Sequence, residues 1–354
     1  RVDRRQRQMC IRDSWCRHYH WCFLWRSCSL VCPCSRARDD HFSLRLFLYP
    51  LSKRDKMTQE TSSSIDRKAL RTFLVIAFPL AWVLFLVPLA FKNADPQIHQ
   101  IVITVFFALA MWAPGIAAIV ATKKADGSLA ALNIKTLGPK RYYLWAWLLF
   151  PILSVLTGVV TVLFRVAEFD PTLSLIRQSL AALPEDVPLD AAAIVALQAG
   201  VAIFIAPLIN ILFAFGEELG WRGFLLPKLM PLGKWKAIII SNVIWGLWHA
   251  PAIVQGHNYP GYPVLGVFMM VVLTVLVGII LSWLYLKTNS PWAPALAHGS
   301  MNAVASLSLL FLVPGFDVAI GGTLASVMGW IPLAGFVLWL VLSQRLPING
   351  RSQK

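Results

Sequence analysis

Long apolar runs separated by short polar segments dominate the chain from residue 57 onward. When each run is ended at a charge, a Pro or a Gly, the pattern predicts eight helices, at about 70–91, 98–122, 143–166, 191–216, 235–254, 263–286, 292–313 and 323–343. Runs such as 72–91 and 264–286 carry almost no charge and reach the roughly 20 residues that a helix needs to cross a bilayer. The pattern predicts an all-α fold, a polytopic membrane bundle of about eight transmembrane helices.

The positive charges are distributed unequally between the two sides of these predicted spans. Of the 19 Lys and Arg residues from Met57 onward, 16 fall in the loops of one side, and only Lys92, Arg165 and Arg177 fall on the other. Because an excess of Lys and Arg marks the cytoplasmic side, we expect both termini in the cytoplasm. The loop 168–190 then faces outward, and a short interfacial helix is expected within it at about 174–183.

The composition supports a membrane protein. Of the 354 residues, 57% are hydrophobic and only 14% are charged, whereas a soluble domain has about 25% charged residues. The net charge of +15 could indicate nucleic-acid binding, but from Met57 onward these cations lie between apolar spans rather than on one basic surface. We therefore expect membrane lipid, and not nucleic acid, as a partner.

The first 56 residues differ from the rest of the chain. All six cysteines of the protein precede residue 35, their spacing lacks the paired CxxC groups of a zinc module, and no signal-peptide pattern is present. Met57, followed by a polar run, resembles a natural start. We interpret residues 1–56 as a disordered, non-native or mis-called extension.

A small set of polar side chains lies inside or at the ends of the predicted spans. A charge at the centre of a membrane helix costs at least ~2.5 kcal/mol, so such residues tend to face protein and to have a function. The set consists of Glu217, Glu218, Arg222, His249, His298 and Asn302. His99 and His257 lie at span ends or in a polar loop, where we expect solvated side chains.

Glu217 and Glu218 should have different tasks, because adjacent residues on a helix point about 100° apart. Glu218 precedes Arg222 by four residues, the spacing of an ion pair on one helix face, which leaves Glu217 free to turn inward. The alternative is that this segment is a cytoplasmic helix end with solvated carboxylates.

The two histidines have less distinctive surroundings when each is taken alone. His249 could simply bind a neighbouring backbone carbonyl, and His298 with Asn302, one helical turn apart, could hold two helices together. In combination, however, two carboxylates, two imidazoles and an amide on three helices are the groups needed to activate water and to stabilise an oxyanion.

At these residues the sequence resembles the CPBP family, the CAAX-protease and bacteriocin-processing (Rce1-like, or Abi) intramembrane endopeptidases. The family pattern is EExxxR, then FxxxH, then HxxxN or HxxxD. The segments 217–222 and 298–302 match the first and third motifs. In the second motif His249 is in place, but Trp245 stands where Phe is usual and is expected to preserve an aromatic wall. The resemblance covers about residues 190–315.

The resemblance implies proteolysis of a membrane-associated peptide. Glu217 and His249 would activate water, His298 and Asn302 would stabilise the oxyanion, and Glu218, Arg222 and Trp245 would support them. Glu217, His249 and His298 could hold Zn²⁺ in an open site, but a metal-free glutamate mechanism is equally compatible with a sequence that lacks HExxH.

The predicted spans, together with the extent of the resemblance, suggest how the chain is organised, although the resemblance does not identify the first spans. The N-terminal transmembrane helices would occupy 57–190, the catalytic core 191–315, and the last helix with a cytoplasmic tail 316–354. The short loops favour a prokaryotic plasma membrane, with a prenylated CAAX-like, signal-like or bacteriocin peptide as substrate. The alternative is a non-catalytic membrane protein, either a bacteriocin-immunity protein or a proton-coupled transporter. The sequence makes no prediction of oligomeric state.

Overall fold

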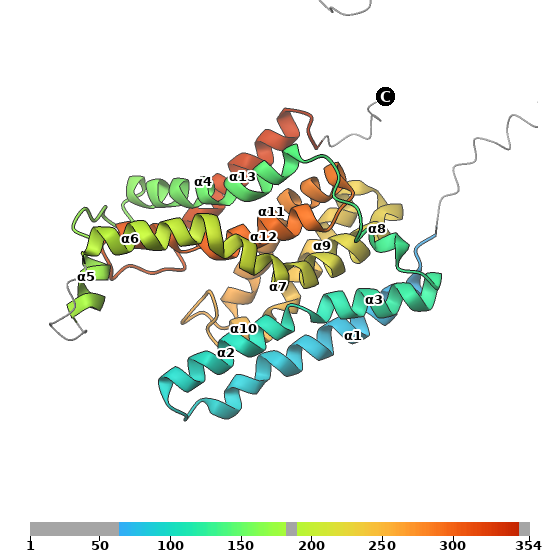
Figure 1. Cartoon of the computed structure of the whole chain (residues 1–354), viewed down its shortest axis with the longest axis horizontal. Helices are drawn as coiled ribbons and strands as arrows, with labels where there is room; N and C mark the ends of the chain where they lie inside the picture. Colours follow the sequence, from blue (N-terminus) through green and yellow to red (C-terminus); the bar gives the residue numbers. More distant parts are fainter. Residues whose placement is uncertain (1–63, 182–189, 347–354) are drawn as a thin grey trace, which may run out of the picture. The chain divides into compact units, whose positions relative to one another are not determined.

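A computed structural model describes residues 64–181 and 190–346, and the interpretation of residues 1–56 lies outside these ranges. The described chain is mainly helical (Figure 1). The helices are α1 (Arg67–Leu86), α2 (Pro96–Ala110), α3 (Ala113–Asp126), α4 (Arg141–Leu163), α5 (Ser174–Ala181), α6 (Ala191–Gly200), α7 (Ala206–Gly220), α8 (Leu226–Leu229), α9 (Lys234–Trp248), α10 (Ala250–Val254), α11 (Leu265–Thr288), α12 (Trp292–Val304) and α13 (Val327–Leu342).

The predicted all-α membrane bundle is confirmed. Helices occur within all eight predicted intervals, and the two described ranges contain no β-strand beyond one isolated bridge. Five helical segments are long and apolar enough to cross a bilayer: Arg67–Phe91, Pro96–Asp126, Arg141–Leu163, Ala191–Leu232 and Leu265–Thr288. Because α9, α12 and α13 have only 15, 13 and 16 residues, the count of eight spans stays a prediction.

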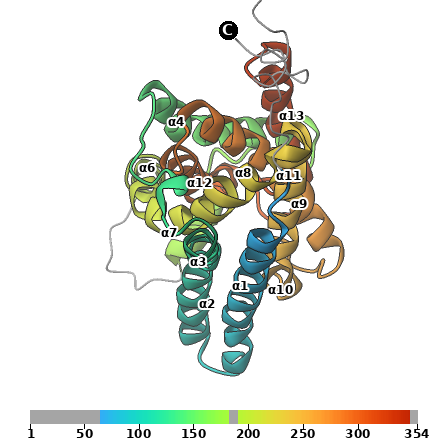
Figure 2. The same ribbon diagram turned by 90° about the vertical axis from the view of Figure 1, so that its right-hand side faces the viewer.

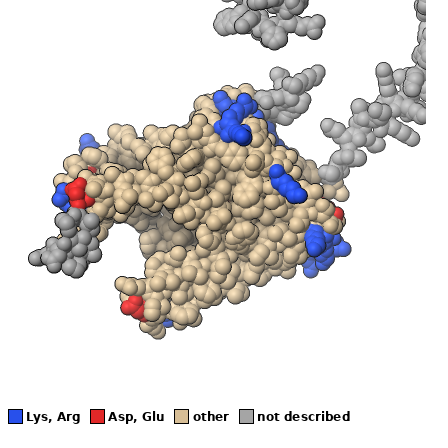
Figure 3. Space-filling view, viewed as in Figure 1, with Lys and Arg blue, Asp and Glu red and all other residues tan. Residues whose placement is uncertain are grey.

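The surface of the described chain is suited to lipid. Large apolar side chains on α2, α4 and α7 are more than half exposed, including Ile98, Ile101, Leu144, Val155 and Leu208. A soluble monomer rarely leaves so much apolar surface in water. Figure 3 shows most of the visible Lys and Arg toward the end where α3 ends and α8 lies, a few charged residues at the opposite end, and broad uncharged surface between them. The chain is an integral membrane protein, and its orientation stays a prediction.

The segment that carries the first motif is longer than the sequence pattern suggests. The predicted fourth helix ends at residue 216, but the helical run continues from Ala191 to Leu232. Two π-helical turns interrupt it, at Val201–Ile205 and Trp221–Leu225, and each lies just before a proline, Pro207 or Pro227. A proline in a helix lacks an N–H donor and crowds the carbonyl four residues earlier, and a widened turn accommodates both effects.

Helix α7 lies between α3 and α12 (Figures 1 and 2). Small residues allow this close packing. A Cβ on Gly115 of α3 would lie 2.8 Å from the backbone oxygen of Gly216, and a Cβ on Gly299 of α12 would lie 3.0 Å from the backbone nitrogen of Ile211. Small residues are typical where membrane helices approach each other closely. Gly216 directly precedes the two glutamates, so this packing buries them.

The short helix predicted within the loop 168–190 is present as α5, and Asp170 caps the turn that precedes it. The Asp170 carboxylate accepts hydrogen bonds from the hydroxyl and backbone N–H of Ser174, at 2.5 and 2.6 Å, and from those of Thr172, at 2.6 and 2.9 Å. These bonds, above all that from the Ser174 hydroxyl, hold the pKa of Asp170 well below its usual value of 3.8.

We expect the contribution of Asp170 to stability to depend on pH. A carboxyl whose pKa is depressed in the folded state stabilises that state above its unfolded pKa, and this stabilisation is lost as the pH falls below it. Asp170→Asn should therefore lower the thermal unfolding midpoint near neutral pH, and its difference from wild type should shrink below pH 3.8. Glu168→Gln, an exposed change in the same loop, is the control. A difference that stays constant with pH would contradict this role.

Candidate active site

The polar side chains identified from the sequence come from α7, the π-helical turn after it, the end of α9 and the middle of α12. Glu217, Glu218 and Arg222 are 2%, 0% and 1% exposed, and His298 is 3% exposed. The alternative of a solvated helix end is therefore wrong for this segment. The helix continues past the motif, and the packing of α3 and α12 against α7 covers it.

Glu218 and Arg222 form the ion pair that their spacing predicts. Nη1 of Arg222 lies 2.8 Å from Oε1 of Glu218. The same oxygen accepts from Nδ1 of His298 at 2.9 Å, and Nη2 of Arg222 donates to Oδ1 of Asn242 at 2.8 Å. The pair is thus part of a buried network that joins α7, α9 and α12. Buried charges need such partners because removing them from water is costly.

Glu217 faces a different set of partners. Its Oε2 accepts a hydrogen bond from the indole N–H of Trp245 at 2.6 Å and a longer one from that of Trp221 at 3.4 Å. Its Oε1 has no hydrogen-bond partner among the described residues. The two adjacent glutamates therefore differ as expected: Glu218 binds cations, whereas Glu217 is held by neutral donors through one oxygen only.

His249 follows the last residue of α9, and its Nδ1 lies 2.9 Å from the backbone oxygen of Trp245. A carbonyl oxygen can only accept, so Nδ1 carries a proton, and in the neutral form of the ring Nε2 keeps its lone pair. The bond to a backbone carbonyl, expected as the alternative role of this histidine, is thus present. It leaves Nε2 available as a base or ligand, so it is compatible with a role in catalysis.

Trp245 connects the members of this site. Besides its bond to Glu217, its ring lies 4.3 Å from the guanidinium carbon of Arg222. The rings of His298 and His249 pack edge-on to it, with centroids 5.4 and 5.8 Å away. Six of the seven residues identified from the sequence are therefore joined by direct contacts. The seventh, Asn302, lies one turn after His298, is exposed, and its side chain makes no hydrogen bond within the described ranges.

Two residues of the network were not expected from the sequence. Trp221 follows Glu217 by four residues, and Asn242 precedes Trp245 by three, so both share a helix face with a motif residue. An amide within the apolar run 235–254 was a signal that could have identified Asn242. Its contact requires Gly278 of α11, where a Cβ would lie 1.9 Å from Oδ1 of Asn242.

The metal candidates do not form a coordination site in this arrangement. Across residues 64–181 and 190–346, no group of three or more His, Cys, Asp or Glu side chains is placed to hold a metal ion. Glu217, His249 and His298 therefore do not fit the three-ligand zinc site that the family resemblance suggested, and we derive no step through a metal.

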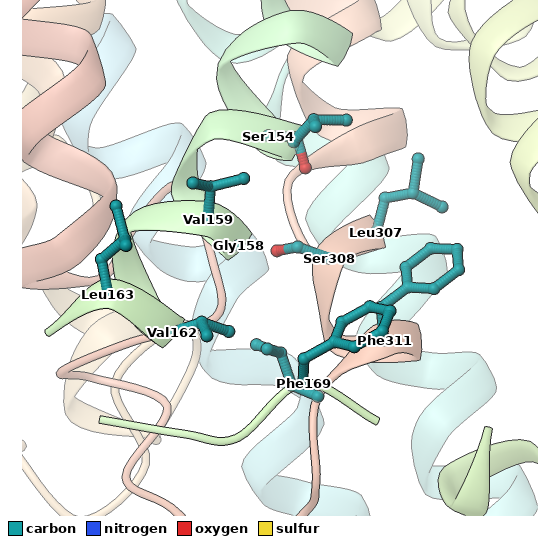
Figure 4. Close-up of a pocket in the computed structure, with 11 residues that line it drawn as sticks. Ser154, Gly158, Val159, Val162, Leu163, Phe169, Leu307, Ser308 and Phe311 are labelled. Atoms are coloured by element: carbon teal, nitrogen blue, oxygen red, sulfur yellow. The ribbon is translucent and has the colours of Figure 1, made fainter. Parts of the chain in front are cut away.

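A separate apolar pocket lies beside the C-terminal half of α4 (Figure 4). It has a volume of about 460 Å³ and is lined by residues of α4, by Phe169 and by the 3-10 turn Leu307–Phe311. Its two hydroxyl groups are engaged: Ser154 donates to the backbone oxygen of Val304 and Ser308 to that of Gly322, both at 2.7 Å. Because no titratable side chain lines this pocket, it offers no group for acid–base chemistry.

The fold and the site define a class: an integral membrane protein whose helices bury a network of carboxylates, a guanidinium and an imidazole. Residues 198–304 match the family of Rce1-like proteins, described as type II CAAX prenyl endopeptidases. This match confirms the family resemblance and supports a CAAX-type membrane peptidase. All three motifs lie inside the matched segment. No curated protein matches the chain.

Proposed function

We propose that this protein is an intramembrane endopeptidase that hydrolyses a membrane-associated peptide, with Glu217 as the base. The observation that carries the proposal is the environment of this carboxylate. It is buried inside the family-matched segment, one of its oxygens is held by Trp245, and both motif histidines pack against that same indole. A carboxylate and imidazoles placed together in this way are suited to activating a water molecule.

In the proposed reaction, Glu217 accepts a proton from water while the water oxygen bonds to the carbonyl carbon of the scissile peptide bond. The carbonyl π electrons move to its oxygen. Nε2 of His249, which keeps its lone pair, orients the water. The proton then passes from Glu217 to the amide nitrogen as the C–N bond breaks, which releases an amine and a carboxylic acid.

Residues of α12 are proposed to stabilise the oxyanion that forms on the carbonyl oxygen. In this proposal His298 carries a proton on both ring nitrogens, so that Nδ1 donates to Glu218 and Nε2 donates to the developing negative charge. The carboxamide of Asn302 is the second donor. Its lack of other hydrogen bonds within the described ranges leaves it free for substrate. Glu218 and Arg222 hold His298 and α9 in position through the network described above.

The substrate proposed is a lipid-linked or apolar peptide at the cytoplasmic surface of a prokaryotic plasma membrane. This follows from the family match and from the predicted orientation, which places the cation-rich end of the chain in the cytoplasm. A prenylated CAAX-like peptide and a signal-like or bacteriocin peptide are the two candidates. The catalytic core proposed for residues 191–315 contains the matched segment.

The test is cleavage of internally quenched peptides by purified protein in liposomes. One peptide carries a farnesylated CAAX end, the second has the same sequence without the lipid, and the third is signal-like. We expect wild type to cleave at least one of them and Glu217→Ala to cleave none, with mass spectrometry identifying the bond. Equal turnover by both proteins, or none by folded wild type, would contradict the proposal and favour a non-catalytic role.

A further inference from the structure

Trp245 stands at the one motif position where this chain departs from the family pattern. A phenylalanine there could supply an aromatic wall but no hydrogen bond, whereas the indole of tryptophan carries a single N–H donor. In this structure that donor is used: Nε1 of Trp245 lies 2.6 Å from Oε2 of Glu217. The expectation that tryptophan only preserves the wall is therefore incomplete.

We infer that Trp245 is a positioning residue for the catalytic base, acting through this indole hydrogen bond. The inference rests on the proposed function, in which Glu217 is the base. Both side chains are nearly inaccessible, with Trp245 1% and Glu217 2% exposed, so water does not compete for the bond. A hydrogen bond to a charged group is stronger than one between neutral groups, and a low local dielectric strengthens it further.

The hydrogen bond from the Trp245 indole engages only one of the two carboxylate oxygens of Glu217. Because Oε2 accepts from Trp245 and more weakly from Trp221, the carboxylate plane is fixed, and Oε1 is the oxygen that stays available for water. Trp221 lies on the same helical run as Glu217, whereas Trp245 lies on α9. The bond from Trp245 therefore fixes the base relative to the helix that also carries His249.

The backbone of Trp245 orients the imidazole of His249. Its carbonyl oxygen accepts from Nδ1 of His249 at 2.9 Å, so the residue that holds Glu217 also fixes the tautomer and ring orientation of His249. Its ring in addition covers the guanidinium of Arg222 at 4.3 Å. Phenylalanine would retain the backbone bond and an aromatic ring, so Trp245→Phe removes the indole N–H together with part of the ring, and a matched Trp→Phe control is needed to separate the two losses.

We expect Trp245→Phe to lower kcat by roughly 10- to 100-fold, the loss expected for a buried hydrogen bond to a charged group. KM should change less than kcat, because an aromatic ring still lines the site. Trp221→Phe, which removes the longer bond, should have a smaller effect. Trp292→Phe is the matched control, since it removes an indole bond of 2.8 Å that ends on the backbone oxygen of Ile134 rather than on a carboxylate. We expect its kcat to stay close to that of wild type.

A second measurement does not require turnover. Infrared difference spectra of protein with isotope-labelled glutamate, assigned with Glu217→Gln, report the carboxylate stretch of Glu217. The band should shift in Trp245→Phe and stay in place in Trp292→Phe. A Trp245→Phe protein with the wild-type band and the wild-type kcat would overturn the inference. If wild type cleaves no peptide but the band shifts, the hydrogen bond stands and the proposed function fails.

Discussion

Glu217→Gln should reduce kcat by ~10²-fold or more, because the isosteric amide keeps the packing but cannot accept the proton of the attacking water. The amide retains an oxygen that can accept from Trp245, so the fold around the site should be unchanged. His249→Ala should cause a loss of similar size. The measurement is kcat on whichever peptide wild type cleaves, with the thermal unfolding midpoint of each variant as the check on folding.

The double variant gives the sharper test. If Glu217 and His249 act on the same water, removing both should cost about as much as removing either, because groups that act as a unit are not additive. Asn302→Ala should lose less, as one of two oxyanion donors. If the fold-losses in kcat of the two single variants multiply in the double variant, Glu217 and His249 act independently of each other. Full activity of Glu217→Gln would identify the site as a structural network.

The second large effect is expected at Arg222. Arg222→Ala leaves the Glu218 carboxylate buried without its cation, and breaking a buried ion pair in this way costs about 3–5 kcal/mol. Arg222→Lys keeps the charge but cannot reach both Glu218 and Asn242 with a planar fork, so we expect an intermediate loss. Thermal unfolding in detergent measures both variants.

Two controls separate stability from chemistry. Lys228→Ala removes a partly exposed cation that lies 3.5 Å from Asp66 and 3.8 Å from Asp126, and such a pair is worth about 0–1 kcal/mol. The pair Glu218→Gln with Arg222→Met removes both buried charges and should recover much of the stability lost in Arg222→Ala. Activity should not return with it, because His298 has then lost its carboxylate partner. Recovery of activity would show that the pair is dispensable for function.

The sequence alone determined the features that depend on short distances along the chain. Each of the eight apolar runs contains helix in the structure, because a segment of such composition must satisfy its backbone internally in a bilayer. The Glu218–Arg222 pair was predictable because positions four apart on a helix are neighbours whatever surrounds them. The motif residues could also be identified, since ionisable groups are rare in apolar runs.

The tertiary structure decided which of these groups meet, and how. The sequence pattern ended the fourth helix at residue 216, whereas the structure continues it to Leu232 through the π-helical turn Trp221–Leu225. This widened turn accommodates Pro227, so the helix does not end there. The hydrogen bond from Trp245 to Glu217 depends on the distance between α7 and α9 and on the rotation of each helix about its axis. Both quantities are set by the packing of these helices against their neighbours. Such contacts join residues far apart in the chain, and a hydrogen bond forms or fails within a few tenths of an ångström. For that reason the residues of the site could be identified from the sequence, whereas the hydrogen bond from the Trp245 indole to Glu217 became apparent only in the packed structure.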